Sequence, residues 1–260
     1  MRFRNIETIL RKPLAALLVA ITLASAQGPA MADEVLVAVA SNFTGAIKAV
    51  AERFEQDTGH EVVLSFGSTG KHYAQIRHGA PYHAFFAADV KRPQMLDDEG
   101  RIVPGSRFTY AFGELVLWSP DAELVDAGGG ILAQGDFQRL AIANPRLAPY
   151  GAAAQQVLEA RGLWDALQPR VVRGENIGQA YQYVKSGAAQ LGFVAYSQVR
   201  TPDSDPSGSA WVVPEELYTP IEQQAVLLKD TPAARAFMDY VRSKEAADII
   251  EGYGYGVAGE

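Results

Sequence analysis

The sequence predicts an α/β fold in which a doubly wound parallel sheet is followed by a second βα unit. Three observations support this prediction. Short apolar runs rich in valine alternate with segments of helical periodicity. The pattern shifts near residues 109–118, and a second set of alternating segments follows. The chain has 260 residues, of which 48% are hydrophobic and 20% charged, which is typical of a globular protein.

Residues 1–32 have the layout of a secretory signal peptide. Basic residues precede an apolar run at 14–26, and Ala30 and Ala32 form a small-x-small cleavage site. A transmembrane anchor is the alternative, but the run is shorter than the roughly 20 residues that span a bilayer. No later stretch is long and apolar enough to cross a membrane. We therefore expect an exported protein, most consistent with a bacterial periplasm.

The elements that follow alternate in a regular order. Residues 35–40 form a continuous apolar run, as in a strand buried on both faces, and N-cap formers at 41–44 begin a helix that ends near Gly59. The other strands are expected at 61–66, 85–89, 115–118, 140–143, 171–172, 191–195 and 223–228. The other helices are expected at about 71–77, through 95–96, and at 152–161, 177–185, 233–242 and 244–251. Residues 126–130 and 201–209 read as loops.

Hydroxyl-rich turns are the main functional signal. Ser41 and Asn42 directly follow the first strand, and Ser68 and Thr69 follow the second. In an α/β sheet these positions lie at the carboxyl edge, where ligands bind. Helix N-termini there present unpaired N–H groups, which favour anions. Two such turns could bind one small oxyanion, although ordinary helix capping also explains each turn alone.

Other kinds of site find little support. The chain has no cysteine, which excludes disulfides and thiolate chemistry, and its net charge of −7 disfavours a nucleic-acid binder. The four histidines lack metal-ligand spacing, and residues 67–71 lack the spacing of a phosphate loop. No nucleophile elbow occurs. Tyr253 and Tyr255 could suggest ferric-iron ligation, but packing of the last helix explains them better.

The order and spacing of several blocks resemble the periplasmic molybdate-binding proteins of ABC importers. The resemblance covers essentially the whole chain after residue 32, and its blocks are at residues 37–43, 65–70, 86–89, 143–151, 174–177, 191–194 and 246–255. It implies an α/β, two-lobe periplasmic-binding-protein fold. Each lobe would be a mostly parallel sheet flanked by helices, with the ligand in the interlobe cleft. The implied first lobe is 33–112 plus 222–260, and the second is 113–221.

The resemblance also implies a binding site made without charged side chains. The positions that match its oxyanion ligands are Ser41, Asn42, Thr69 with Ser68 beside it, and the backbone N–H groups of Tyr150 and Ile177. Two departures occur. Tyr196 lies one residue later than a tyrosine ligand of some members, and His83 replaces an aspartate that is common in the family.

The function implied is capture of molybdate or tungstate in the periplasm and delivery to an ABC transporter permease. No cofactor, catalysis or nucleic acid is expected, and we expect a monomer. The alternatives are a binding protein for sulfate, ferric iron or an organic acid, and an exported α/β enzyme. The two dianions, molybdate and tungstate, are so similar in size and charge that the sequence does not rank them.

Overall fold

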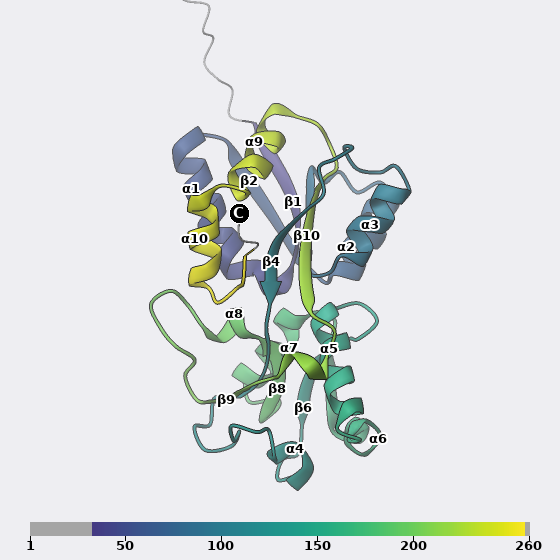
Figure 1. The fold of residues 1–260 in the computed structure, drawn as a ribbon, viewed down its shortest axis with the longest axis vertical. Coiled ribbons are helices and arrows are strands. Elements are labelled where there is room, and N and C mark those ends of the chain that lie inside the picture. Colours follow the sequence, from purple (N-terminus) through teal and green to yellow (C-terminus); the bar gives the residue numbers. More distant parts are fainter. Residues whose placement is uncertain (1–32, 258–260) are drawn as a thin grey trace, which may run out of the picture. The chain divides into compact units, whose positions relative to one another are not determined.

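Two five-stranded sheets form the framework of residues 33–257, which are the residues described by the computed structural model (Figure 1). The predicted signal peptide lies outside these described residues. In spatial order the first sheet contains β2 (Glu61–Gly67), β1 (Glu34–Ala40), β3 (Ala84–Ala87), β10 (Ile221–Leu227) and β4 (Phe108–Gly113). The second contains β7 (Val171–Gly174), β6 (Leu140–Ala143), β8 (Leu191–Ala195), β5 (Leu115–Ser119) and β9 (Ser209–Val212).

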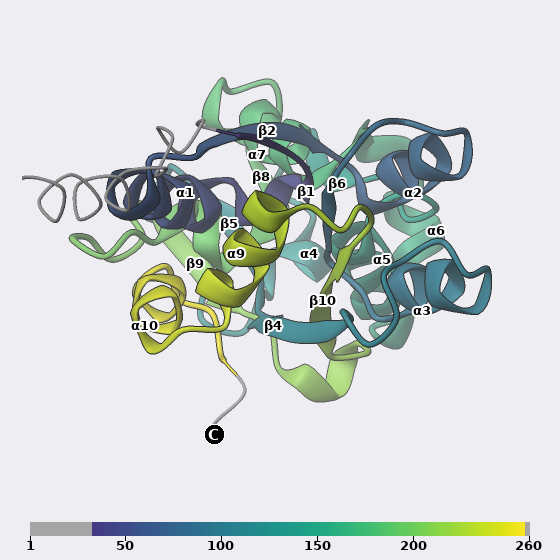
Figure 2. The ribbon, with the colours of Figure 1, turned by 90° about the horizontal axis from the view of Figure 1, so that it is seen from above.

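Helices cover both faces of the first sheet. On one face lie α1 (Thr44–Thr58), α9 (Pro232–Val241) and α10 (Lys244–Gly252), and on the other α2 (Thr69–Arg77) and α3 (Lys91–Asp98) (Figure 2). The alternation along β1 explains this layering. Val35, Val37 and Val39 pack toward α1 and α9, whereas Ala38 packs toward α2 and α3.

The second sheet is packed in the same way on two faces. Leu115, Leu117 and Ile142 join the core under α5 (Pro149–Ala160), and Val116 and Val194 join the core that contains α7 (Ile177–Lys185). The remaining helices are short: α4 (Ile131–Gln134), α6 (Trp164–Leu167), α8 (Tyr196–Val199), and the 3₁₀ turns η1 (Ser41–Phe43), η2 (Gln168–Arg170) and η3 (Glu215–Leu217).

The predicted α/β class is confirmed, and each sheet is mostly parallel as expected, with a single strand, β10 in the first and β5 in the second, running against the other four. In the first sheet β1 pairs in parallel with β2 and β3, while β10 pairs antiparallel with β3 and β4. The second sheet repeats this division, with β5 antiparallel to β8 and β9. The parallel strands are linked by helical crossovers, which keep neighbouring strands parallel. Strands β10 and β5 instead arrive from the opposite sheet, so no crossover fixes their direction.

The chain passes between the sheets at two neighbouring points. The first passage runs from Gly113, the end of β4, to Leu115, the start of β5. The second leads into β10 at Ile221, which pairs with Gly113. The two connections therefore lie side by side. Within 33–257 no helix has the length and apolar character needed to cross a bilayer.

Candidate functional site

A small cavity lies where the carboxyl ends of β1, β2 and β3 meet the N-termini of α5 and α7. Its volume is about 10 Å³, roughly the space that one water molecule needs. The residues lining it are Ala40, Ser41, Asn42, Gly67, Ser68, Thr69, Ala88, Ala148, Pro149, Tyr150 and Ile177. All six residues selected from the sequence are therefore brought together at this one cavity.

Helix N-termini supply the polar groups of the cavity. Ser68 caps α2, where its Oγ accepts the Lys71 N–H at 3.3 Å, and Asn176 caps α7 by accepting the Gln179 N–H at 2.9 Å. Proline at the first position of α5 is compatible with a helix start. Tyr150 and Ile177 lie in the first turns of α5 and α7, where backbone N–H groups have no carbonyl partner within the helix. The site therefore concentrates donors and partial positive charge.

The hydroxyl of Thr69 keeps its proton available for a ligand. Its Oγ1 accepts the backbone N–H of Ala88 at 3.1 Å, which fixes the side chain at the carboxyl end of β3. A threonine hydroxyl carries one donor in addition to its acceptor lone pairs. With Thr69 only 1% exposed, that donor lies in an environment largely free of water. Ser68 is similar, because its Oγ also acts as an acceptor.

The side-chain amide of Asn42 points away from the cavity. The Nδ2 atom donates to Gln223 Oε1 at 2.7 Å and to the Tyr255 hydroxyl at 3.1 Å. An amide nitrogen has two hydrogens, so both are used by these buried partners. The group that Asn42 can offer to a ligand is its backbone N–H in the turn η1.

Ser41 connects the two halves of the site, the first contributed by the first sheet with its helices and the second by the second sheet with its helices. Its hydroxyl donates to Asn176 Oδ1 and accepts the Gly178 N–H, both at 3.1 Å. Other bonds cross at the same place: Gly70 N–H to the Leu147 carbonyl at 2.9 Å, and Ser197 Oγ to the Asn42 carbonyl at 3.1 Å. The two sheets with their helices are thus closed around the cavity. A bound anion would compete with Asn176 for the Ser41 proton.

No charged side chain is among the described residues that line the cavity. Lys71 is the nearest cation in sequence, and its side chain is 57% exposed and lies 3.8 Å from the Glu175 carboxylate. Lys71 therefore points to solvent and not into the cavity. Any anion in the cavity would therefore be held by oriented dipoles rather than by a paired cation.

The histidines and the last tyrosines have structural partners. His72 is buried beside Gly67, and burial lowers its pKa below the ordinary 6.5. His83 Nδ1 accepts the Leu36 N–H at 2.8 Å. The Tyr255 hydroxyl donates to the Asn42 carbonyl at 2.8 Å, and burial raises its pKa, so it is a neutral phenol. Across 33–257, no three His, Asp or Glu residues are grouped to hold a metal ion.

Tyr196 does not line the cavity. Its hydroxyl accepts from Arg200 Nη1 at 3.3 Å, and its ring packs against Gly254. The one-residue displacement seen in the sequence thus corresponds to a side chain that packs at the C-terminal segment.

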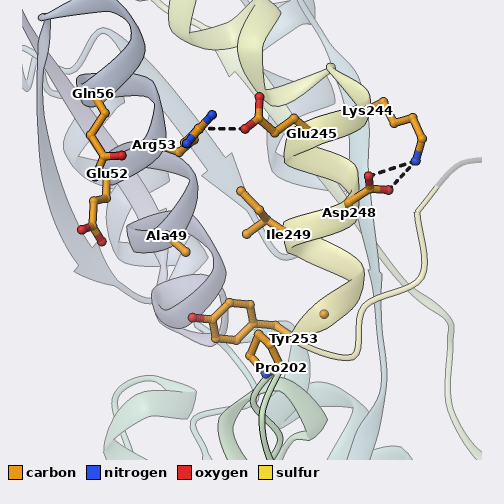
Figure 3. A pocket seen from close by; sticks show the side chains of 11 residues that line it. Ala49, Glu52, Arg53, Gln56, Pro202, Lys244, Glu245, Asp248, Ile249 and Tyr253 are labelled. Atoms are coloured by element: carbon orange, nitrogen blue, oxygen red, sulfur yellow. Dashed lines mark hydrogen bonds and ion pairs between the residues drawn. The ribbon is translucent and has the colours of Figure 1, made fainter.

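A much larger cavity, of about 830 Å³, lies between α1 and α10 (Figure 3). Four of its charged side chains form two ion pairs: Arg53 with Glu245 at 2.8 Å, and Lys244 with Asp248 at 2.7 Å. Glu52 also lines it. This combination of carboxylates and an open surface is unfavourable for a small anion, in spite of the size of the cavity.

Sequence reasoning missed three residues that make polar contacts around the site: Gly178 through its backbone N–H, and Ser197 and Gln223 through their side chains. Gly178 and Ser197 contact the first half from the second, and Gln223 is fully buried behind Asn42. No short motif marks any of them. The only signal was a pair of glutamines at the start of the otherwise apolar strand predicted at 223–228.

Comparisons with known proteins agree with this geometry. The profile of a family described as bacterial extracellular solute-binding protein matches residues 35–256. The molybdate-binding protein ModA of Azotobacter vinelandii is 52% identical over 231 residues, which cover 88% of this chain and 92% of that protein. ModA of Rhodobacter capsulatus is 48% identical over 230 residues, 87% of this chain and 90% of that protein. The solved periplasmic molybdate-binding protein of Azotobacter vinelandii superposes with a TM-score of 0.84 at 46% identity, and the match covers 86% of this chain and 100% of that chain.

Proposed function

Because this chain belongs to the bacterial extracellular solute-binding proteins, and within them to the molybdate-binding proteins, we propose that it captures molybdate or tungstate in the periplasm and delivers it to the permease of an ABC importer. It is a binding protein and not an enzyme. Its ligand is cargo, and it carries no cofactor.

The observation that carries this proposal is the convergence of uncharged donors on one small cavity. We assign the oxyanion contacts to the hydroxyls of Thr69 and Ser68 and to the backbone N–H groups of Asn42, Tyr150 and Ile177. Ser41 joins them when its proton turns from Asn176 to the ligand. Preorganised donors in a site with little water stabilise negative charge strongly, because they need no reorganisation on binding.

The same donors account for selection among oxyanions. A protonated phosphate brings an O–H that needs an acceptor, and an unpaired buried donor is costly. Sulfate has no such proton, so its rejection depends on the size of the cavity. Molybdate and tungstate are larger than sulfate, so a site that opens to their size would hold sulfate less closely.

Binding would be coupled to movement of two lobes. We assign residues 33–112 plus 222–260 to one lobe and 113–221 to the other, with the hinge at the paired residues Gly113 and Ile221. The bonds of Ser41 to Asn176 and Gly178 would form on closure. A ligand that contacts both lobes shifts the population toward the closed form.

The proposal extends to the form of the protein in the cell. Residues 1–32 would be removed as a signal peptide on export, and the remaining chain would act as a monomer without a nucleic-acid partner. The excess of acidic over basic side chains, 30 against 23, supports the last point.

Isothermal titration calorimetry of the purified protein tests the ligand. We expect binding of molybdate and tungstate, with little or no heat from sulfate, phosphate, ferric salts or organic acids. Melting experiments give a second measure, since a ligand at 100 times its Kd adds about 2.7 kcal/mol to the folded state. Equal stabilisation by sulfate would contradict size selection, and binding of ferric iron or an organic acid alone would assign another ligand.

A further inference from the structure

A buried polar network lies behind the cavity, and Gln223 is at its centre. Gln223 has no exposed surface, although a buried amide is costly unless its polar atoms are satisfied. It lies on β10, two residues after Ile221, where β10 pairs with β4 at the passage between the sheets. The oxyanion contacts assigned above do not include it.

The carbonyl end of Gln223 is bonded to the first half of the site. Its Oε1 accepts from Asn42 Nδ2 at 2.7 Å and lies 3.0 Å from the Tyr110 hydroxyl. The Tyr110 hydroxyl is also 3.2 Å from the carbonyl of Ala87, the residue before the Ala88 N–H that anchors Thr69. The Gln223 amide is thus bonded directly to Asn42, and it is linked through Tyr110 to the end of β3, beside Thr69.

The nitrogen end of Gln223 faces the second half. Its Nε2 lies 3.5 Å from the hydroxyl of Tyr150, whose backbone N–H is at the start of α5. Gly113 leaves the space for this approach: a β-carbon there would overlap the Tyr150 hydroxyl and lie 2.7 Å from Gln223 Nε2. Tyr150 is itself 1% exposed, so it has little freedom to choose another partner.

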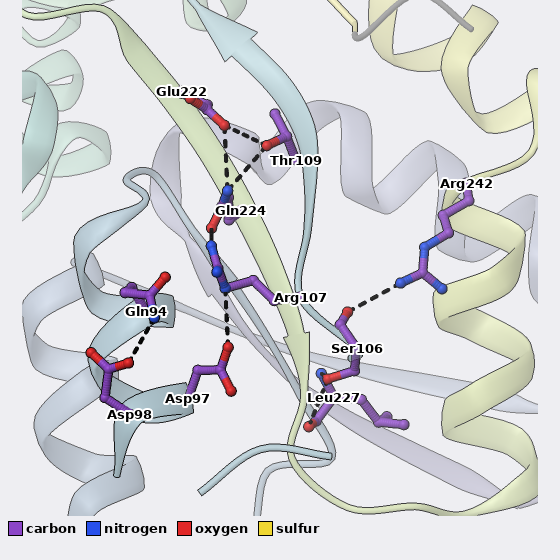
Figure 4. Close-up of polar contacts among 10 residues, drawn as sticks. All are labelled: Gln94, Asp97, Asp98, Ser106, Arg107, Thr109, Glu222, Gln224, Leu227 and Arg242. Carbon is purple, nitrogen blue, oxygen red and sulfur yellow. Dashed lines mark hydrogen bonds and ion pairs between the residues drawn. The ribbon is translucent and has the colours of Figure 1, made fainter. Parts of the chain in front are cut away.

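An irregularity in the sheet gives Gln223 this position. The pairing of β10 with β4 matches Gln223 to Ala111 and Gln224 to Thr109, which leaves Tyr110 as an extra residue on β4. Such bulges redirect side chains and are frequent beside functional sites. Here the bulge brings the Tyr110 hydroxyl to Gln223, while the next residue, Gln224, belongs to a separate network (Figure 4).

We propose that Gln223 is a positioning residue that holds the Asn42 turn of one lobe and the Tyr150 helix start of the other in the geometry that binds the oxyanion. This inference rests on the proposed function and adds to it a residue that touches no ligand. Its mechanism is orientation: with both Asn42 amide hydrogens held, the Asn42 backbone N–H is fixed, and Tyr150 is held at the hinge. Preorganised sites of this kind depend on the supporting contacts behind the ligand residues.

Gln223→Leu and a matched control test the inference. Leucine has similar bulk and no polar atoms, so Asn42 and Tyr110 each lose one of two partners, and Tyr150 loses its contact with the amide. We expect the Kd for molybdate to rise about ten-fold or more. The control is Gln224→Leu on the same strand, which breaks bonds to Arg107 and Thr109 (Figure 4). It should lower the melting temperature and leave the Kd within about two-fold of the original.

Gln223→Glu adds a second test, the pH dependence of molybdate affinity, which a general loss of stability would not change. A neutral carboxyl can still accept from Asn42 and donate to Tyr150, whereas an ionised one adds negative charge behind the oxyanion. Burial raises the pKa of a carboxyl. The titratable groups facing it are the phenols of Tyr110 and Tyr150, and Tyr255 lies beyond Asn42; burial raises the pKa of all three phenols, so none of them titrates in this range. Molybdate affinity of this variant should therefore weaken as pH rises from about 5.5 to about 8, more steeply than in the original protein.

Amide hydrogen exchange without ligand separates this inference from the proposed function. In Gln223→Leu the N–H groups at 41–45 and at 150–153 should both exchange faster than in the original protein and in Gln224→Leu. Failure of the original protein to bind molybdate would refute the proposed function and leave this measurement valid. Unchanged exchange at both segments, an unchanged Kd in Gln223→Leu, or an equal loss of affinity in Gln224→Leu would overturn the role assigned to Gln223.

Discussion

Replacing Thr69 by valine tests whether neutral donors bind the oxyanion. Valine keeps the branched shape of the side chain and removes only the hydroxyl. In the structure Oγ1 has one partner in the protein, the Ala88 N–H at 3.1 Å, so its own proton is free to meet a ligand. The substitution therefore removes one ligand contact and leaves one buried backbone donor unpaired.

The two losses have separate magnitudes. A hydrogen bond to a charged group contributes about 1.5–3 kcal/mol, so the affinity for molybdate should fall by roughly 10- to 150-fold. The unpaired Ala88 N–H should cost the ligand-free protein about 1–3 kcal/mol. For a domain of this size that corresponds to a decrease in melting temperature of roughly 2–12 °C.

Calorimetry gives the affinity, and thermal unfolding without ligand gives the stability. Thr58→Val is the matched control, because Thr58 Oγ1 donates to the Phe54 carbonyl at 2.8 Å, within α1 and away from the cavity. It should leave the Kd unchanged. Lys71→Gln is the opposing variant. Its exposed pairing with Glu175 predicts at most a few-fold loss of affinity, and that loss should shrink as salt rises.

The reasoning fails if Lys71→Gln abolishes binding while Thr69→Val leaves it intact. That result would mean that a cation holds the dianion, even if molybdate is the ligand. A loss of affinity in Thr58→Val as large as in Thr69→Val would also contradict it, since hydroxyls far from the cavity would then matter equally.

Three further predictions concern movement, packing and pH. Solution scattering should show a smaller radius of gyration with molybdate than without, and an unchanged profile would contradict hinge closure. Gly113→Ala should weaken molybdate binding in calorimetry, because the added methyl overlaps the Tyr150 hydroxyl; Gly128→Ala, where the nearest atom would lie 3.4 Å away, should not. Burial lowers the pKa of His72 below 6.5, so on acidification the unfolded chain takes up the proton first. The contribution of neutral His72 to the free energy of unfolding should therefore be fully present above about pH 6.5 and decrease below it. Urea titrations at several pH values measure this decrease. An equally steep decrease in His72→Gln would mean that another group causes it.

Local patterns predicted the fold elements well. The valine run of β1 and the N-cap residue Ser68 act over three or four residues, so each can be recognised without knowledge of the rest of the chain. The N-cap expected at 41–44 is wrong, because no side chain caps η1 or α1 and the Ser41 hydroxyl bonds to Asn176 instead. The helices predicted at 233–242 and 244–251 correspond to α9 and α10 for the same reason. The direction of β5 and β10 could not be predicted in this way. Each pairs antiparallel because the chain enters it from the other sheet, and the residues of the strand itself do not encode this.

The sequence by itself determined which turns carry hydroxyls and helix N-termini at the edge of a sheet, and it carried the blocks that resemble molybdate-binding proteins. That these residues bind an oxyanion is still a prediction. Only the tertiary structure decided how they are used. Ser41 reaches Asn176 across 135 residues of sequence, and Asn42 reaches Gln223 across 181 and Tyr255 across 213. Caps and periodicity depend on neighbours within one or two turns, whereas the direction of the Asn42 amide depends on which distant groups the packed chain places beside it.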